Sequence, residues 1–337
     1  MLAVTLLLVA IACGSDTTAT QPATQPTEVP TSTVTAPPTS AVTAPSALSA
    51  GATDATPTTE APIVITAPAL TEERFVEDAV LQRLGPEPPT LDPHITVSGE
   101  SALYVVEIYG GLVTIDRNLR VVPDLAKDWE ISNGGMTYTF FLREDAKFHN
   151  GKPVTAQDFK WSIERAAAPK TASPVADTYL NDIVGAMDYI EGNASEISGI
   201  KVIDDLTLQI TIDAPKAYFL AKLTYPTAFI LDRENVEGDG DTWLQRPNGT
   251  GPFKLAEYQI GEILRLARNE YYHLGPPNLD EVEFILAGGN AMLMYENDKI
   301  HLTGVGLADL ERVLDPGEPL NAELRAAPSS FGVSYIG

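Results

Sequence analysis

The chain has 337 residues, a formal net charge of −24 at pH 7 and a single cysteine. This acidity disfavours binding to nucleic acid and to anionic lipid surfaces, because both carry negative charge. A well-solvated surface, a preference for cationic ligands and a salty habitat are the three explanations that the charge leaves open. One cysteine excludes an intrachain disulfide framework and suits an extracytoplasmic protein that is stabilised by its size.

The chain begins with an apolar run at residues 1–12, MLAVTLLLVAIA. This run is too short to cross a ~30 Å hydrocarbon core, which takes about 20 helical residues, and it is typical of a secretory signal. It stops at Cys13, in a context that resembles a bacterial lipobox, where the thiol becomes acylated. We therefore predict a lipoprotein signal peptide at 1–12 and lipidation at Cys13, with a buried cysteine as the alternative. No Lys or Arg precedes the run, so we expect the natural start to lie upstream of Met1.

Residues 13–70 are rich in Thr, Pro, Ala and Ser, with few charges and no aromatic residue. Such a segment cannot bury enough apolar surface to offset the entropy lost on ordering. Its prolines favour a semi-extended chain. We predict a disordered stalk between a membrane anchor and a globular body.

The globular body starts near residue 72 and is long enough for one large domain or two smaller ones. Phe75–Gln82 predicts a first strand, and the proline-rich segment Gly85–His94 predicts a rigid turn after it. Ser98–Ile108 predicts a helix, which Gly110-Gly111 closes.

The block Leu125–Phe159 predicts a helical turn, a β-hairpin, a loop and the start of a second helix. Asn133-Gly134-Gly135 can supply the positive φ angles of a tight hairpin. Large apolar residues alternate through the second arm, which is typical of a half-buried strand. We therefore expect Trp129, Tyr138 and Phe140 in the hydrophobic core and not on a ligand platform.

Further elements follow along the chain. Thr155, with Asp158 three residues later, predicts a helix start close to a capping box. Ile200–Ile212 alternates around an Asp-Asp turn and predicts a second hairpin. The loop Gly249–Leu255 is rich in glycine, but it opens a strand and lacks the Gly-Lys-Ser/Thr ending, so we predict a turn and not a phosphate cradle. Helices and strands mix without a strict βαβ rhythm, which favours a mixed α/β or α+β architecture.

The sequence predicts neither a catalytic constellation nor a metal cluster. It contains no GxSxG nucleophile elbow, and no pair of histidines has the spacing of metal ligands. We expect each histidine to be solvated or hydrogen-bonded, and we expect no cofactor. The four histidines are His94, His149, His273 and His301.

Several segments together resemble family 5 extracellular solute-binding proteins, which are the oligopeptide, dipeptide and nickel receptors of ABC importers. They occur in the order of the family and cover nearly all of Phe75–Phe284. The segment TASP resembles the oligopeptide branch in particular. The segments are Glu87–Pro93, Tyr109–Leu112, Leu125–Phe159, Arg165–Pro174, Gly249–Leu255 and Leu266–Tyr272.

The resemblance implies a mixed α/β fold of the type II periplasmic-binding-protein kind. It implies a discontinuous lobe I at residues 71–109 and 234–337 and an inserted scaffold domain at 110–233. The family continues well beyond the equivalent of Gly337, so we expect a C-terminally truncated fragment. That fragment would lack the second lobe and would bind ligand weakly or not at all.

The resemblance also implies where a ligand binds. Peptide receptors of the family hold the peptide backbone by strand-like hydrogen bonds, and matching places this contact at Val97, Ser98 and Gly99. An ordinary helix-entry loop is the alternative for these residues. A second contact falls at Val175, where the oligopeptide branch carries an aromatic residue. No metal ligand is implied.

The function implied is capture of oligopeptides outside the membrane for import, with hinge closure and no covalent chemistry. The implied partners are the permease and ATPase subunits of an ABC importer, and the membrane through a lipid anchor. We expect a monomer, extracytoplasmic and attached to the bacterial cell membrane, on the periplasmic or outer face, without nucleic acid. The alternatives are a receptor for dipeptides, nickel chelates or other small solutes, a sensor or chaperone with the same fold, and a hydrolase.

Overall fold

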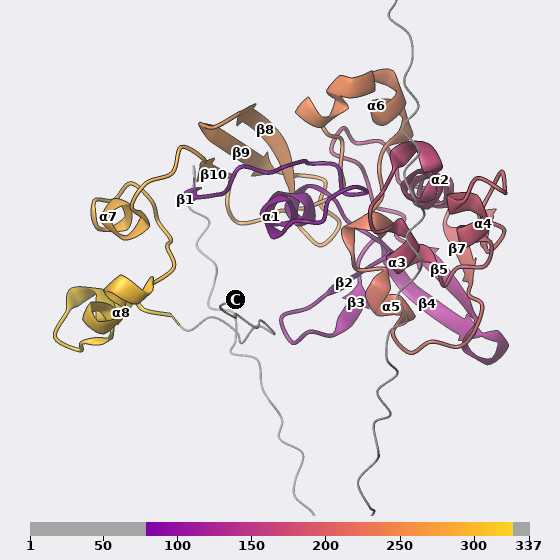
Figure 1. The fold of residues 1–337 in the computed structure, drawn as a ribbon, viewed down its shortest axis with the longest axis horizontal. Helices are drawn as coiled ribbons and strands as arrows, with labels where there is room; N and C mark the ends of the chain where they lie inside the picture. The colour runs from indigo at the N-terminus through magenta and orange to yellow at the C-terminus, as the bar shows by residue number, and fades with distance from the viewer. Residues whose placement is uncertain (1–78, 326–337) are drawn as a thin grey trace, which may run out of the picture. The chain divides into compact units, whose positions relative to one another are not determined.

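The computed structural model describes residues 79–325 of the chain. The predicted signal peptide, the lipidation site at Cys13, the stalk at 13–70 and the first residues of the predicted first strand lie outside the described residues. Helices and strands are mixed along the described part of the chain (Figure 1), as the sequence predicts, and the strands form three sheets there. Between residues 79 and 325, no helix is long and apolar enough to span a membrane.

The elements of this part of the chain have the following bounds. The strands are β1 (Val80–Leu84), β2 (Val113–Ile115), β3 (Val121–Pro123), β4 (Ala126–Ser132), β5 (Thr137–Leu142), β6 (Ile200–Asp204), β7 (Thr207–Thr211), β8 (Phe253–Gln259), β9 (Ile263–Arg268) and β10 (Glu281–Ile285). The α-helices are α1 (Gly99–Ile108), α2 (Ala156–Ala167), α3 (Ala176–Leu180), α4 (Ala186–Ile190), α5 (Phe219–Lys222), α6 (Arg233–Gly238), α7 (Ala291–Glu296) and α8 (Leu307–Leu314). The 3-10 helices are η1 (Asn133–Gly135), η2 (Pro169–Thr171), η3 (Pro226–Ala228), η4 (Gly240–Gln245) and η5 (Pro319–Glu323).

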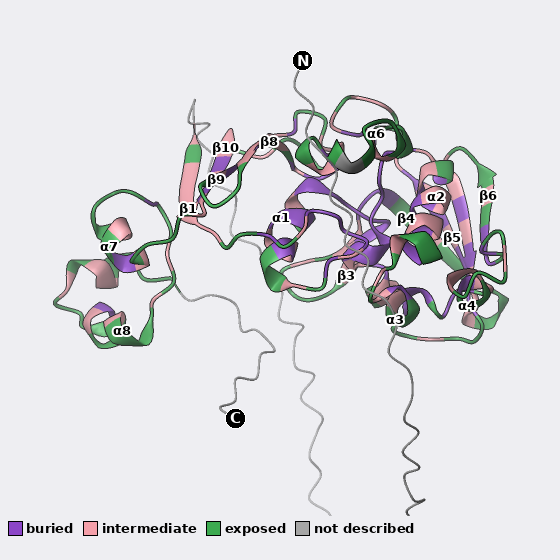
Figure 2. Cartoon of the chain, turned by 45° about the horizontal axis from the view of Figure 1, so that its top comes forward, coloured by how far each residue is buried: buried purple, intermediate pink, exposed green. Residues whose placement is uncertain are grey.

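The first sheet has the strand order β1-β10-β9-β8, in which only the β1–β10 pair is parallel. The first strand continues to Leu84, two residues beyond its predicted end, because its backbone stays paired with β10 up to the partners Leu84 and Ile285. Helix α1 packs against this sheet, and the rings of Tyr104 and Phe284 meet edge to face with centroids 4.8 Å apart. In Figure 2, α1 carries buried residues on one side and exposed residues on the other.

The second sheet has the order β4-β5-β7-β6 and is antiparallel throughout. The predicted hairpins at 129–142 and 200–212 both form, and Gly134 takes a φ of 64° in the turn of the first. The predicted helical turn at the start of the first hairpin is wrong. Its residues belong to β4, because Ala126 already pairs with Leu142 of β5.

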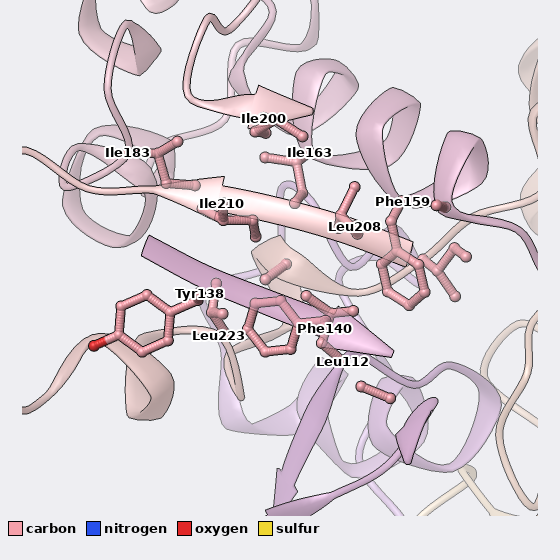
Figure 3. Packing of buried hydrophobic residues seen from close by; sticks show 14 of the residues in the cluster. Leu112, Tyr138, Phe140, Phe159, Ile163, Ile183, Ile200, Leu208, Ile210 and Leu223 are labelled. Carbon is pink, nitrogen blue, oxygen red and sulfur yellow. The ribbon is translucent and has the colours of Figure 1, made fainter. Parts of the chain in front are cut away.

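The hydrophobic core beside this sheet consists of side chains from one face of the sheet and from the helices that pack against it (Figure 3). Phe140 is fully buried, Tyr138 is 5% exposed, and Trp129 packs against the cluster from its edge. The prediction of core residues is confirmed for Tyr138 and Phe140, while Trp129 is partly buried at the margin of the core. Phe159 and Ile163 of α2 are also fully buried in this cluster.

A second hydrophobic cluster lies between α1 and the first sheet, and it includes Phe229 and Leu231. The first cluster draws its buried residues from Leu112 to Ile230 alone. The division into a discontinuous lobe I and an inserted domain at 110–233 stays a prediction, because residues 229 and 231 of the proposed insert pack in the second cluster.

Candidate ligand-binding segments

The proline-rich turn before α1 is fixed by hydrogen bonds to that helix. The Tyr104 hydroxyl donates to the Pro86 carbonyl at 2.6 Å, and the Thr90 amide donates to Ser101 Oγ at 3.2 Å. The Asp92 amide then donates to Thr90 Oγ1 at 3.0 Å. The turn therefore approaches the start of α1 in one defined conformation.

A buried charged cluster joins this turn to helix α2. The Arg165 guanidinium donates to Asp92 Oδ2 at 2.7 Å and to Asp92 Oδ1 at 3.1 Å, a bidentate pair. Arg165 Nη1 also donates to His94 Nδ1 at 2.9 Å, and the guanidinium lies 5.3 Å from the centroid of the Trp243 ring. Such planar bidentate geometry is the strong form of an ion pair.

His94 is the neutral member of this cluster. Its Nδ1 accepts from Arg165, so its Nε2 carries the hydrogen and donates to the Phe229 carbonyl at 2.9 Å. Burial lowers the pKa of the imidazole from 6.5 to about 4, against the opposing charge of Asp92 and with a further decrease from Arg165. A neutral ring is what both hydrogen bonds require.

The predicted contact residues Val97, Ser98 and Gly99 come a few positions after His94 in the sequence. Ser98 caps α1, with an extended backbone at φ −100° and ψ 146°, and its Oγ accepts from the Ser101 amide at 3.1 Å. The Val97 side chain is 61% exposed, and a Cβ added at Gly99 would meet nothing within 4 Å. The backbone N–H and C=O of Val97 have no hydrogen-bond partner among the described residues.

Val175 lies at the other predicted contact. It is partly buried and precedes α3, and its carbonyl accepts from the amides of Thr178 and Tyr179, each at 3.1 Å. Thr171, in the TASP segment before it, donates from Oγ1 to the Arg165 carbonyl at 2.5 Å.

No hydrogen bond joins Val175 directly to Val97, Ser98 or Gly99. The link is Arg165, whose side chain holds the turn at Asp92 and whose carbonyl holds Thr171. Arg165 is not among the site residues that the sequence predicts. A single arginine in an amphipathic helix carries no local signal of a partner 73 residues away.

All four histidines are hydrogen-bonded, as predicted. His149 Nε2 lies 3.2 Å from the Gly251 carbonyl, and His273 Nε2 lies 2.8 Å from Asp124 Oδ1. His301 Nδ1 accepts from the Gln82 amide at 3.0 Å. Among residues 79–325, no group of three or more His, Cys, Asp or Glu is placed to hold a metal ion.

Comparison with known proteins shows which family the chain belongs to. The family described as bacterial extracellular solute-binding proteins, family 5, middle region, matches residues 120–336. The chain belongs to this family. The family is one of binding receptors, and the comparisons indicate no catalytic family.

Curated relatives of this family 5 chain bind different ligands. The probable deoxycholate-binding periplasmic protein YgiS of Escherichia coli is 31% identical over 250 residues, which cover 72% of this chain and 46% of YgiS. The periplasmic oligopeptide-binding protein OppA of Haemophilus influenzae is 34% identical over 247 residues, covering 69% and 45% of the two chains. The dipeptide-binding protein DppE of Bacillus subtilis is 31% identical and covers 59% of this chain and 37% of its own.

Solved structures agree with these matches. The murein tripeptide-binding protein MppA of E. coli gives a TM-score of 0.67 at 30% identity, covering 73% of this chain and 50% of its own. The H. influenzae OppA complex with the peptide RPPGFSPFR gives a TM-score of 0.64 at 29% identity, covering 72% and 49%. These similarities confirm the predicted family and the mixed α/β fold of periplasmic peptide-binding proteins. This chain spans half or less of the length of each relative named here.

Proposed function

We propose that the protein is the extracytoplasmic receptor of an ABC importer and that it captures oligopeptides. The observation that carries this proposal is the exposed and unpaired backbone of Val97, which precedes the extended Ser98 and lies between the cap of α1 and the buried turn at Asp92. A peptide recognised through its main chain needs such a strand-like edge, and the edge accepts many side-chain sequences.

The proposed contact residues are Val97, Ser98, Gly99 and Val175. Arg165 would keep the two segments in place, because it holds the chain on both sides. Peptide-binding relatives support a peptide ligand. A second candidate is an amphipathic solute such as deoxycholate, which the name of YgiS favours.

The test separates backbone recognition from side-chain recognition at one position. Val97→Pro removes the free amide, whereas Val97→Ala removes only the side chain. Titrations with mixed tri- to pentapeptides, followed by NMR chemical shifts, measure the binding. Val97→Pro should weaken binding about tenfold, the value of one lost hydrogen bond, and Val97→Ala should bind like the wild type.

Circular dichroism of both variants checks that each still folds. Equal affinities in Val97→Pro and wild type would contradict recognition through this backbone. Saturable binding of deoxycholate without any binding of peptides would favour the second candidate instead.

The remaining parts of the proposal concern the cellular setting. We infer a lipid anchor at Cys13, a membrane-attached monomer, and permease and ATPase subunits as partners. Mass spectrometry of the cell-derived protein would reveal the acyl group, and Cys13→Ser should release the protein from the membrane. A Cys13→Ser protein that stays membrane-bound would rule out the anchor at this position.

A further inference from the structure

A cavity of about 460 Å³ lies beside the C-terminal half of α1, away from the cap at Ser98. Its walls come from α1, β2, the start of the β3–β4 connection, the segment from Thr224 to Phe229, the loop before β8 and the segment after β9. Val106 and Phe229 form apolar walls, while Glu107, Asp124, Thr250 and Tyr272 contribute polar ones. No Lys, Arg or His lines it.

The cavity lining contains two carboxylates, and the nearest arginines, Arg83 and Arg143, lie outside it. Glu107 is half-buried and makes no hydrogen bond or ion pair with any described residue, and burial raises the pKa of its carboxyl group, with an opposing effect of the Arg83 charge. Asp124 is 6% exposed. Burial raises the pKa of Tyr272 above its ordinary range, the charges of Asp124 and Glu107 raise it further, and the charge of Arg143 opposes them. Both carboxylates therefore act on the same hydroxyl.

The recognised partners of the Asp124 carboxylate do not use all of its accepting capacity. His273 Nε2 donates to Oδ1 at 2.8 Å, from outside the cavity lining. The Gly111 amide donates to Oδ2 at 3.1 Å, and the Arg143 guanidinium donates to the main-chain carbonyl of Asp124 at 2.7 Å. A carboxylate oxygen accepts more than one hydrogen bond, so Oδ2 keeps accepting capacity.

A buried hydroxyl without a partner faces the same space. Thr250 is fully buried and lines the cavity, and its Oγ1 has no hydrogen-bond partner. A Cβ at Gly110 would lie 2.9 Å from Asp124 Oδ2 and 3.2 Å from Thr250 Oγ1. Asp124 Oδ2 and Thr250 Oγ1 therefore both lie close to Gly110, where the backbone carries no side chain. An unsatisfied buried hydroxyl is unfavourable unless a ligand or water completes it.

We propose that this cavity binds a small primary alkylamine in its ammonium form. An ammonium group has three N–H donors, which match the carboxylates of Glu107 and Asp124 and the Thr250 hydroxyl. The alkyl chain would lie against Val106 and Phe229. An anion would meet two carboxylates and no lining cation, so the charge of the site selects against it. This site is separate from the peptide contact and does not rest on the proposed function.

The test uses the full chain with n-butylamine as the probe and the neutral n-butanol as its control. Glu107→Gln keeps the shape of the side chain and removes its charge. Glu100→Gln makes the same change in the exposed first turn of the same helix. We expect n-butylamine to bind saturably in NMR titrations, Glu107→Gln to weaken binding about tenfold and Glu100→Gln to bind like the wild type. n-Butanol should not saturate.

A second variant tests the geometry. Gly110→Ala places a methyl group against Asp124 Oδ2 and Thr250 Oγ1 and, where circular dichroism shows a folded protein, should weaken n-butylamine binding by a similar factor. Absence of saturable binding would overturn the proposal, as would equal binding of n-butanol or equal losses in the Glu107 and Glu100 variants. Because peptides are absent from this titration, failure here leaves the peptide proposal untouched.

Discussion

At the residue scale, the pair of Arg165 and Asp92 is the strongest single connection between the turn and α2. Their side chains are only 13% and 6% exposed, so the partner that remains after a substitution would be left charged in a poorly solvated site. Breaking a buried pair from one side costs about 3–5 kcal/mol. This pair is therefore expected to matter far more to stability than the ion pairs on the surface.

Arg165→Lys is the sharpest test of this pair, because it keeps the charge and removes the planar fork. We expect the free energy of unfolding to fall by about 2 kcal/mol, the value of one to two charge-assisted hydrogen bonds. Arg233→Lys, in the exposed pair with Glu237, is the matched control and should unfold like the wild type. Equal urea midpoints for all three proteins would show that the bidentate contact adds nothing.

Because two histidines are buried, we expect the folded protein to lose stability in mild acid. Burial lowers the pKa of both His94 and His149 from 6.5 to about 4. Between these pH values the unfolded chain binds more protons than the folded protein, so stability is complete above pH 6.5 and falls as the pH decreases towards 4. Each histidine contributes a slope of up to about 1.4 kcal/mol per pH unit.

Urea unfolding at a series of pH values measures this slope. His94→Gln should unfold with a shallower pH dependence than the wild type, whatever its stability at neutral pH. Glu107, whose pKa is raised by burial, acts in the opposite direction in both proteins and cancels in the comparison. Parallel curves would mean that the pKa of His94 is the same in the folded and the unfolded protein.

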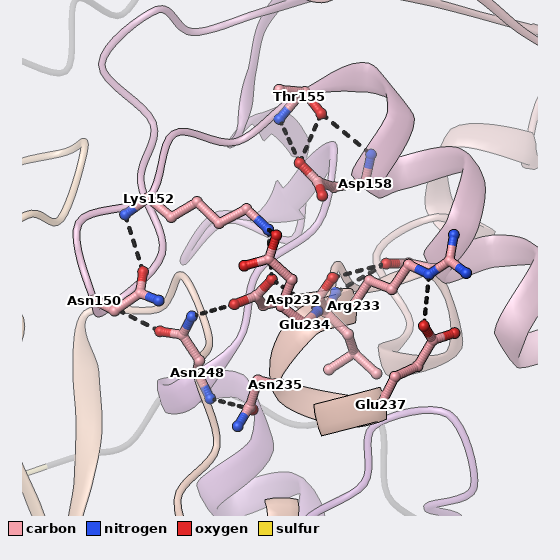
Figure 4. A network of polar contacts seen from close by, with 12 residues as sticks. Asn150, Lys152, Thr155, Asp158, Asp232, Arg233, Glu234, Asn235, Glu237 and Asn248 are labelled. Carbon is pink, nitrogen blue, oxygen red and sulfur yellow. Dashed lines mark hydrogen bonds and ion pairs between the residues drawn. The ribbon is translucent and has the colours of Figure 1, made fainter. Parts of the chain in front are cut away.

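At the scale of single elements, the start of α2 depends on a reciprocal cap (Figure 4). The Asp158 amide donates to Thr155 Oγ1 at 3.4 Å, and the Thr155 amide donates to Asp158 Oδ2 at 2.9 Å. Thr155→Ala removes the first bond and the hydrogen bond that the Thr155 hydroxyl donates to Asp158 Oδ2 at 2.7 Å, and we expect it to lower the free energy of unfolding by about 1 kcal/mol. Gln157→Ala, an exposed change in the same turn, is the control. Similar denaturation midpoints for the two variants would contradict a stabilising cap.

This cap and the first hairpin show what local sequence can predict. Asn133, Gly134 and Thr155 act within a few residues of their own position, through positive φ angles and a cap. The helical turn predicted at Leu125 failed because pairing with β5, which is set by the whole sheet, decided the conformation of Ala126. Tertiary contacts of this kind override local propensity.

The candidate site was less predictable than the fold. The positions of Val97 and Val175 came from a family resemblance, and their role as contacts stays a prediction. The Arg165–Asp92 pair joins residues 73 positions apart, and no periodicity in the sequence encodes such a contact. The cavity beside α1 likewise needs residues from several separate segments between Val106 and Tyr272.

At the scale of the whole molecule, the two hydrophobic clusters raise the question of whether the chain folds in two steps. Every buried residue of the first cluster lies between Leu112 and Ile230, and the sheet β4-β5-β7-β6 that it covers is complete within that range. The segment from Leu112 to Ile230 has its own core and, at about 120 residues, is of the size of domains that fold alone.

We therefore predict that residues 110–233, produced as a separate polypeptide, fold cooperatively. The cut exposes Phe229 and Leu231, which pack in the second cluster, and removes the bond from His94 to the Phe229 carbonyl, so the segment should be less stable than the full chain. Thermal unfolding followed by near-ultraviolet circular dichroism tests this. Phe140→Ala in the same segment opens a cavity worth about 3–5 kcal/mol and should abolish the transition. A broad, non-cooperative transition in the unsubstituted segment would show that the two clusters stabilise one another and that 110–233 is not an independent domain.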